Sequence, residues 1–378
     1  MIYLDHNAST PVDPDVADVM LSAVRSNYGN PSSLHAMGTR ARTSMEKARS
    51  QIAELVGVLP EEIFFTSGGT ESNNLAVIGS ALNKGRGHII TSRIEHPSVL
   101  NPCSYLETKG FAVTYVGVDG HGRVSVDEVK KALRTDTIFI SMMHANNETG
   151  VLQPVEEVGI LARERGIIFH TDAAQTLGKI SLQADSLRVD MMTIVPHKFY
   201  GPKGVGALYL RKGLSLHPLL WGAGHERGLR PGTENVPGIA GFGKACELAR
   251  HFVARRMAHT HTITDMLYQG LKEKIAGIRL NGHETLRLPN TLNISVTGID
   301  SIDLLEKIKD TVAGSPGSAC HSGQKNPSPV LKAMGLSDNE ALSSVRLSTG
   351  KDNTEKEMRE AIEILASAVH TLHQKKPG

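Results

Sequence analysis

The stretch Ile167-Ile168-Phe169-His170-Thr171-Asp172-Ala173-Ala174-Gln175 joins an apolar run to a short polar turn. Its first five residues predict a β-strand at 167–171, because short β-branched and aromatic runs are typical of strands. Asp172 then falls at the end of that strand, and ligands of open α/β sheets bind at this edge. An aspartate at this position is equally suited to capping the next helix, so a second feature has to decide between the two roles.

Further strands alternate with helical patterns on both sides of this stretch. This order favours an α/β sheet in which parallel strands are joined by crossover helices. Helices are predicted at 126–133, where Ser125 is suited to the N-cap, and at 155–164. The other strands predicted for this sheet lie at residues 63–66, 88–91, 112–116, 137–143, 191–194 and 206–210.

The part of the chain after Pro237 has a different pattern and predicts a second, smaller α+β unit. It is helical to about residue 278 and ends in an amphipathic helix at 354–372. Strands are predicted between these helices at 291–296 and 345–348. No low-complexity linker separates the two units, so we expect them to pack firmly together. The residues predicted on the apolar face of the last helix are Met358, Ile362, Leu365, Val369 and Leu372.

Composition narrows the class of protein. The 378 residues are 40% hydrophobic and 21% charged, with a formal net charge of +2, which is typical of a folded globular protein. Only 4% are aromatic, so neither charge nor stacking side chains favour a nucleic-acid partner. No apolar run approaches the roughly 18 to 20 residues that cross a bilayer. We expect a cytoplasmic protein with a small-molecule substrate and no membrane or nucleic-acid partner.

A lysine 26 residues beyond Asp172 is the second feature, and it favours a ligand-binding role for Asp172 over a helix cap. Lys198 lies in His197-Lys198-Phe199-Tyr200-Gly201-Pro202, between a strand-like run and a turn rich in glycine and proline. Most lysines are solvated surface charges. A lysine at a strand end opposite an aspartate suggests a Schiff-base lysine facing the carboxylate that keeps a pyridinium nitrogen protonated. The pair therefore predicts pyridoxal 5'-phosphate as cofactor.

Two further motifs suit such a cofactor. The run 67–74, Ser-Gly-Gly-Thr-Glu-Ser-Asn-Asn, lies between a strand and a helix, so backbone amides at Gly69 and Thr70 can point at a phosphate. A Gly-Gly turn is common, and the Lys-Ser/Thr pair of a nucleotide-binding Walker loop is absent from it. His96 follows the next strand and can stack on the cofactor ring and shuttle protons. A purely structural histidine is the competing interpretation of His96.

The three cysteines have different surroundings in the sequence. Cys103 and Cys246 lie on helical patterns and are predicted to be buried small hydrophobes. Cys320 stands among glycines and serines beside His321, which, if protonated, favours the thiolate, and this predicts a nucleophile. Zinc binding is the competing use of Cys320, but no second cysteine lies close in sequence, so we expect no metal site.

Taken together, these motifs closely resemble the NifS/IscS-like cysteine desulfurases, which are pyridoxal-phosphate enzymes of the class V aminotransferase family. The resemblance covers nearly the whole chain and keeps the motifs in one order. The matching segments are 3–10, 67–74, Glu95-His96, 145–150, 170–175, His197-Lys198, 230–235, 317–320 and 344–348.

The resemblance implies fold type I, with a large mixed-sheet domain flanked by helices and a smaller α+β domain. The large, cofactor-binding domain is expected at residues 15–255. The small domain is expected to combine 1–14 with 256–378 and to carry the loop of Cys320.

The resemblance also implies roles at the cofactor. Lys198 would form the Schiff base, and Asp172 would meet the ring nitrogen. Gln175 would donate to the phenolic oxygen, and His96 would stack on the ring as acid and base. The groups implied to hold the phosphate are Gly69, Thr70, His197 and, from a second subunit, Thr233.

The implied reaction converts L-cysteine to L-alanine. Asn147 and Arg346 would grip the substrate carboxylate, since a guanidinium binds a carboxylate with two parallel hydrogen bonds. The thiolate of Cys320 would take the sulfur as a persulfide and pass it to an acceptor, such as an iron–sulfur scaffold or a thiolation protein. Because Thr233 would reach across to the neighbouring site, we expect a homodimer.

Two positions depart from this resemblance. Val195 and Pro196 stand where most such desulfurases carry a serine and a small residue. Together with His321-Ser322, this segment looks more like selenocysteine lyase, which releases selenide and alanine from L-selenocysteine. Pro97 after His96 favours the desulfurase. Two more functions are compatible with these residues: an aminotransferase, in which Cys320 is incidental, and a pyridoxal-binding scaffold without catalysis.

Overall fold

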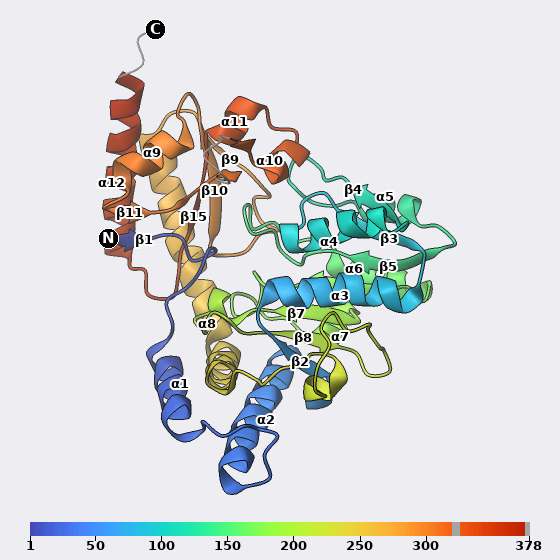
Figure 1. Cartoon of the computed structure of the whole chain (residues 1–378). Coiled ribbons are helices and arrows are strands. Elements are labelled where there is room, and N and C mark those ends of the chain that lie inside the picture. The colour runs from blue at the N-terminus through green and yellow to red at the C-terminus, as the bar shows by residue number, and fades with distance from the viewer. Residues whose placement is uncertain (320–325, 375–378) are drawn as a thin grey trace.

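A seven-stranded sheet forms the centre of the larger part of the molecule (Figure 1). The computed structural model describes residues 1–319 and 326–374. Five neighbouring strands of the sheet run parallel, and one strand is antiparallel to both of its neighbours. The mixed α/β sheet predicted from the sequence is confirmed. In spatial order the strands are β2 (Ile63–Thr66), the antiparallel β8 (Gly206–Leu210), β7 (Met191–Ile194), β6 (Ile168–Asp172), β5 (Thr137–Ser141), β3 (His88–Ser92) and β4 (Ala112–Val116).

Helices connect these strands and cover both faces of the sheet. The helices predicted at 126–133 and 155–164 are confirmed, although within the described ranges Ser125 makes no side-chain capping bond at the start of the first one. The strand predicted to reach residue 143 ends at Ser141, because the Met143 amide donates to the Glu95 carboxylate instead of continuing the ladder. The helices of this part are α1 (Pro14–Ser26), α2 (Ala36–Val56), α3 (Gly69–Lys84), α4 (Pro97–Thr108), α5 (Val126–Ala132), α6 (Val155–Glu164) and α7 (Ala184–Leu187).

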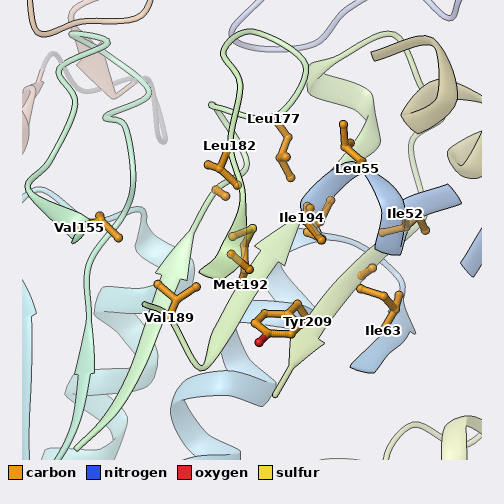
Figure 2. Packing of buried hydrophobic residues seen from close by; sticks show 14 of the residues in the cluster. Ile52, Leu55, Ile63, Val155, Leu177, Leu182, Val189, Met192, Ile194 and Tyr209 are labelled. Atoms are coloured by element: carbon orange, nitrogen blue, oxygen red, sulfur yellow. The ribbon is translucent and has the colours of Figure 1, made fainter. Parts of the chain in front are cut away.

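Two apolar cores lie on the two faces of the central sheet. Side chains alternate along each strand, so Met192 of β7 belongs to one core and its neighbour Met191 to the other. Figure 2 shows the first core, in which Ile52 of α2 packs near Ile63 of β2 and Ile194 of β7. Burying each such side chain contributes roughly 1.5 to 3 kcal/mol. The sheet is therefore a rigid support for the side chains at the ends of its strands.

The second part of the chain builds an antiparallel sheet and its own core. In spatial order its strands are β12 (Ser315–Pro316), β15 (Ser344–Ser348), β10 (Thr291–Val296) and β9 (Ile278–Leu280). The predicted strands at 291–296 and 345–348 are confirmed, whereas the helix predicted to about residue 278 ends at Lys274. Its helices are α9 (Ser301–Ile308), α10 (Pro329–Ala333), α11 (Asp338–Leu342) and α12 (Glu355–Gln374).

The predicted apolar face of the last helix is confirmed by its packing. Four of its five residues are buried in the second core, and Leu372 packs against that core from its edge. The start of the chain joins this core as well, because β1 (Ile2–Tyr3) pairs in parallel with β11 (Val312–Ala313).

One long helix belongs to both parts of the molecule. Figure 1 shows α8 (Val236–Lys274) running from α1 and α2 to the second sheet, and it contacts α1, α2 and α12. The boundary predicted at residues 255 and 256 lies inside this helix, and the division into 15–255 and 1–14 with 256–378 stays a prediction. Among the described residues, no helix is both long enough and apolar enough to span a membrane.

Candidate active site

A cavity of about 440 Å³ lies at the carboxyl ends of β6 and β7. Residues predicted from distant parts of the sequence meet in its wall. Thr233 does not line this cavity, and Cys320 lies outside the described residues, between β13 (Ser318–Ala319) and β14 (Asn326–Pro327) in the sequence. The predicted site residues that line the cavity are Gly69, Thr70, His96, Asn147, Asp172, Gln175, His197, Lys198 and Arg346.

Lys198 ends a single helical turn, Pro196–Lys198, that follows β7. Its Nζ donates to the backbone oxygens of Asn7 at 2.7 Å and Ala8 at 2.8 Å. Burial lowers the pKa of Lys198 to about 8, and the nearby charge of Arg346 contributes to this lowering. A lysine with this pKa is partly uncharged near neutral pH, so it can act as a nucleophile toward a carbonyl group.

Asp172 is the last residue of β6 and is only 7% exposed. Its Oδ1 accepts from the Ala174 amide at 2.9 Å, and its Oδ2 accepts from Asn73 Nδ2 at 2.7 Å. The following residues form turns, and the next helix begins at Ala184, so Asp172 does not cap a helix. Since a carboxylate has about four acceptor sites, Asp172 keeps acceptors for a further donor in the cavity.

The start of α3 forms an anion cradle on another wall. The first backbone hydrogen bond of this helix runs from the Ser72 amide to the Gly68 oxygen at 3.1 Å. The amides of Gly69, Thr70 and Glu71 therefore have no acceptor within the helix, which suits a phosphate. A Cβ on Gly69 would lie 2.8 Å from Val195 Cγ2, so only glycine lets the helix start approach β7 this closely.

His96 is the N-cap of α4 and lines the same cavity. Its Nδ1 accepts from the Ser98 amide at 3.1 Å and lies 2.7 Å from Ser98 Oγ. Burial lowers the pKa of His96, which favours the neutral ring. Because Nδ1 accepts, we assign the proton of the neutral ring to Nε2.

Arg346 comes from β15 of the second sheet, so both parts of the chain build the cavity. Its Nη2 donates to Asp5 Oδ1 at 2.8 Å, and its Nη1 donates to the backbone oxygen of Asn147 at 3.1 Å. Its Nε is buried and has no hydrogen-bond partner among the described residues. This open donor fits an incoming carboxylate.

The structure adds two polar residues that the sequence analysis did not single out. The Nζ of Lys179 donates to Asn7 Oδ1 and to Gln175 Oε1, both at 2.7 Å. Burial, together with the charge of Lys198, keeps the pKa of Lys179 well below its usual range. Gln175 also donates to the backbone oxygen of Asn7 at 3.0 Å, and Lys198 donates to the same oxygen. One hydrogen-bond network therefore joins Lys179, Gln175 and Asn7 to Lys198. Lys179 lies four residues after Gln175, and this spacing was the one sign in the sequence that the two side chains could meet.

The remaining predicted residues lie elsewhere. Thr233 is exposed, and its segment is tied to the start of α3 by the ion pair of Arg230 Nε with Glu71 Oε1 at 3.0 Å. Cys103 and Cys246 are buried free thiols, as predicted. Burial raises the pKa of both, to about 12 for Cys103, so neither is a reactive thiolate.

The central sheet and this cavity define the fold type I class of pyridoxal-phosphate enzymes. The model of the family "Aminotransferase class-V" matches residues 2–360. A cysteine desulfurase IscS of Dictyoglomus turgidum is 44% identical over 380 residues, covering all of this chain and 96% of that protein. A cysteine desulfurase IscS of Methanosarcina thermophila is also 44% identical, over 379 residues, covering all of this chain and 94% of that protein. The chain belongs to the class V aminotransferase family, among its NifS/IscS-like cysteine desulfurases.

Solved structures agree with this assignment. A NifS-like protein superimposes with a TM-score of 0.92 at 39% identity, covering 98% of this chain and 99% of that one. SspA in complex with cysteine superimposes with a TM-score of 0.83 at 36% identity, covering 94% of this chain and 100% of that one. The predicted family and fold are confirmed.

Proposed function

We propose that this chain is a pyridoxal-phosphate-dependent cysteine desulfurase, which converts L-cysteine to L-alanine and transfers the sulfur to Cys320. One observation carries the proposal: Lys198 and Asp172 line the same cavity as Arg346, whose buried Nε has no partner in the described part of the chain. The relatives named above are cysteine desulfurases, and they do not favour a selenocysteine lyase.

The donors and acceptors of the cavity fit pyridoxal phosphate. An amine of lowered pKa suits its aldehyde, a buried carboxylate suits its ring nitrogen, and a helix start with open amides suits its phosphate. Lys198, Asp172 and the amides of Gly69 and Thr70 would hold these three parts. When bound, the cofactor supplies an electron sink that stabilises negative charge at the substrate Cα.

The side chains of this chain then orient the substrate and move protons. Arg346 Nε and the Asn147 side chain would bind the substrate carboxylate, because both residues line the cavity. Lys198 Nζ can accept and return a proton, since its pKa of about 8 lies near the working pH. His96, uncharged and fixed by Ser98, presents Nε2–H as a second donor.

Cys320 would accept the sulfur atom of the substrate. The Cys320 thiolate would attack the substrate sulfur, forming an S–S bond as the substrate C–S bond breaks. The carbon product takes up a proton and leaves as alanine, and the enzyme keeps a persulfide. An acceptor such as an iron–sulfur scaffold or a thiolation protein would take this sulfur.

The second proposal is a homodimer whose subunits complete each other's sites. A groove between α3, α4 and the segment 218–221 is lined by apolar side chains, among them Tyr105 and the 79% exposed Trp221. The groove shares Thr70 and His96 with the active-site cavity. A second copy seated there would cover exposed apolar surface at the mouth of the site, and it would bring its Thr233 toward the phosphate cradle.

Product analysis tests the activity. The wild-type enzyme should release alanine from L-cysteine and form a persulfide on Cys320, and Lys198→Ala should abolish both. Cys320→Ala should stop sulfur transfer, whereas the buried Cys103→Ala should leave it intact. Undiminished turnover of cysteine by Cys320→Ala, with equally good turnover of selenocysteine, would favour the lyase instead.

A further inference from the structure

Arg256 on α8 is a buried cation with an unsatisfied hydrogen-bond donor. It is 8% exposed, and its Nη1 has no acceptor among the described residues. Its guanidinium lies 5.0 Å from the ring centre of Tyr200 and 6.0 Å from that of Phe252. A charged donor buried without an acceptor is costly, and burial lowers the pKa of Arg256 accordingly. An acceptor that is not part of the protein would remove this cost.

Arg256 faces a cavity of about 440 Å³ that is separate from the active site. The cavity lies between the start of α1, the middle of α8 and the segment that joins β15 to α12. Phe252 and Leu248 give it an apolar wall. The charged and titratable residues that line it are Asp13, Asp15, Arg255, Arg256, His259 and Lys351.

The charges of this cavity do not balance. Asp13 is paired with Lys351, whereas Asp15 lies 3.9 Å from Lys244, which is paired more closely with Glu247 at 2.7 Å. Within residues 1–319 and 326–374, neither Arg255 nor Arg256 forms an ion pair within 4.0 Å. The carboxylates of Asp13 and Asp352 act on Arg256 without forming an ion pair with it. The lining therefore has three cations and two carboxylates, and neither guanidinium has a direct carboxylate partner among the described residues, which favours an anionic ligand.

We propose that this cavity binds the phosphate group of a small organic phosphate ester. Guanidinium groups match the oxygens of a phosphate with parallel hydrogen bonds. The apolar wall of Phe252 and Leu248 and the size of the cavity leave room for an organic part beyond the phosphate.

The site is adjacent to the catalytic lysine. Arg256 also lines a small inner cavity of about 20 Å³, together with Lys179, Lys198 and Tyr200. Tyr200 lines this inner cavity, and its hydroxyl accepts at 2.6 Å from the backbone amide of Lys351, a residue of the outer cavity. A ligand in the outer cavity would contact Arg256, which also lines the inner cavity beside Lys179 and Lys198.

Calorimetric titration of the holoenzyme tests the proposal, because the cofactor then occupies the active-site phosphate cradle. The probes are phenyl phosphate and inorganic phosphate, at an ionic strength held constant with chloride. Phenyl phosphate should bind the wild-type enzyme, and Arg256→Met should weaken its binding by about tenfold or more. Arg250→Ala is the matched control, since Arg250 lies on α8 and pairs with Glu54. Its affinity should be unchanged.

Two further measurements keep the proposal falsifiable. Without phosphate, Arg256→Met should melt at a higher temperature than the wild-type protein, because the substitution removes a buried unpaired charge. If this variant does not fold, Arg255→Gln should weaken phenyl phosphate binding by at least about threefold. Equally tight binding of inorganic phosphate would show that the cavity recognises phosphate alone, and this would overturn the proposal of an organic ester. Absence of binding to the wild type, or unchanged binding in the variants, would overturn the proposal.

Discussion

Asn73 on α3 donates a hydrogen bond of 2.7 Å to the carboxylate of Asp172, which lies 99 residues further along the chain. The same amide donates to Ser98 Oγ at 2.8 Å, and Ser98 fixes the ring of His96. The Asn73 side chain thereby helps to position both Asp172, which is expected to meet the ring nitrogen of the cofactor, and His96, which is expected to stack on the cofactor ring.

Replacing Asn73 should therefore weaken cofactor binding. In Asn73→Ala, Asp172 loses a charge-assisted hydrogen bond worth about 1.5 to 3 kcal/mol. We expect the cofactor dissociation constant to rise by roughly tenfold or more, as measured by absorbance during reconstitution. Asn74→Ala is the control, because the bonds of the Asn74 amide go to backbone oxygens of Thr70 and Ser98. An equal loss in both variants would contradict the specific role of Asn73.

The pKa of Lys198, about 8, predicts a pH dependence of cofactor loading. Only the uncharged amine attacks an aldehyde, so the rate of reconstitution should rise with pH and level off above about 8. Stopped-flow absorbance from about pH 6.5 to 9.5 would follow it. A rate that keeps rising toward pH 10, as for an ordinary exposed lysine, would show that burial does not lower this pKa.

Val195 stands where most desulfurases of this kind are expected to carry a hydroxyl near the phosphate. Its methyl group packs against Gly69 in the cradle. Val195→Ser should add one hydrogen bond to the phosphate, worth about 1 to 3 kcal/mol, and slow cofactor loss during dialysis. Val195→Ala, which removes the methyl groups without adding a donor, should not slow it. Equal retention in both variants would show that the serine makes no such bond.

Arg346 should be needed for binding the amino acid more than for binding the cofactor. A lysine at this position keeps the charge but lacks the planar fork. Arg346→Lys should raise KM for cysteine by about tenfold or more, with an unchanged cofactor spectrum. Because the substitution also affects the pair with Asp5, Asp5→Asn serves as the comparison and should raise KM less. An unchanged KM in Arg346→Lys would remove this residue from the substrate site.

The crossing of Thr233 between subunits can be tested by mixing two inactive variants. Lys198→Ala lacks the amine, and Thr233→Asp places a negative charge where the phosphate is expected. If Thr233 acts in the partner's site, each mixed dimer regains one intact site. Random mixing should then restore about a quarter of wild-type activity. No recovery after mixing would place Thr233 in its own subunit's site.

Much of the fold could be predicted because its strands are short, apolar and β-branched. The strands at residues 63–66, 191–194 and 206–210 have the predicted bounds. Errors arose where a long-range contact replaces the local pattern. Met143 looks like a strand residue, but its amide bonds to Glu95, which is 48 residues away. The helical pattern was predicted to reach about residue 278, yet the helix ends at Lys274 and residues 278–280 pair with β10.

The site could be predicted where strand ends bring residues together, as for Lys198 and Asp172, which line one cavity; their roles at the cofactor stay predictions. It was not predictable where a residue acts only through its neighbours. Asn7 and Lys179 look like ordinary polar residues in the sequence, and their importance depends on a network that joins three separate segments. Such a network is visible only after folding brings the segments together.

The 39 residues of α8 form a continuous rod about 58 Å long, and its two halves are anchored in different cores. A rod of this kind has no flexible joint at which the two parts could swing apart. Because α8 joins the parts of the chain that carry Lys198 and Arg346, we expect the spacing of these two side chains to change little when cysteine enters the active site.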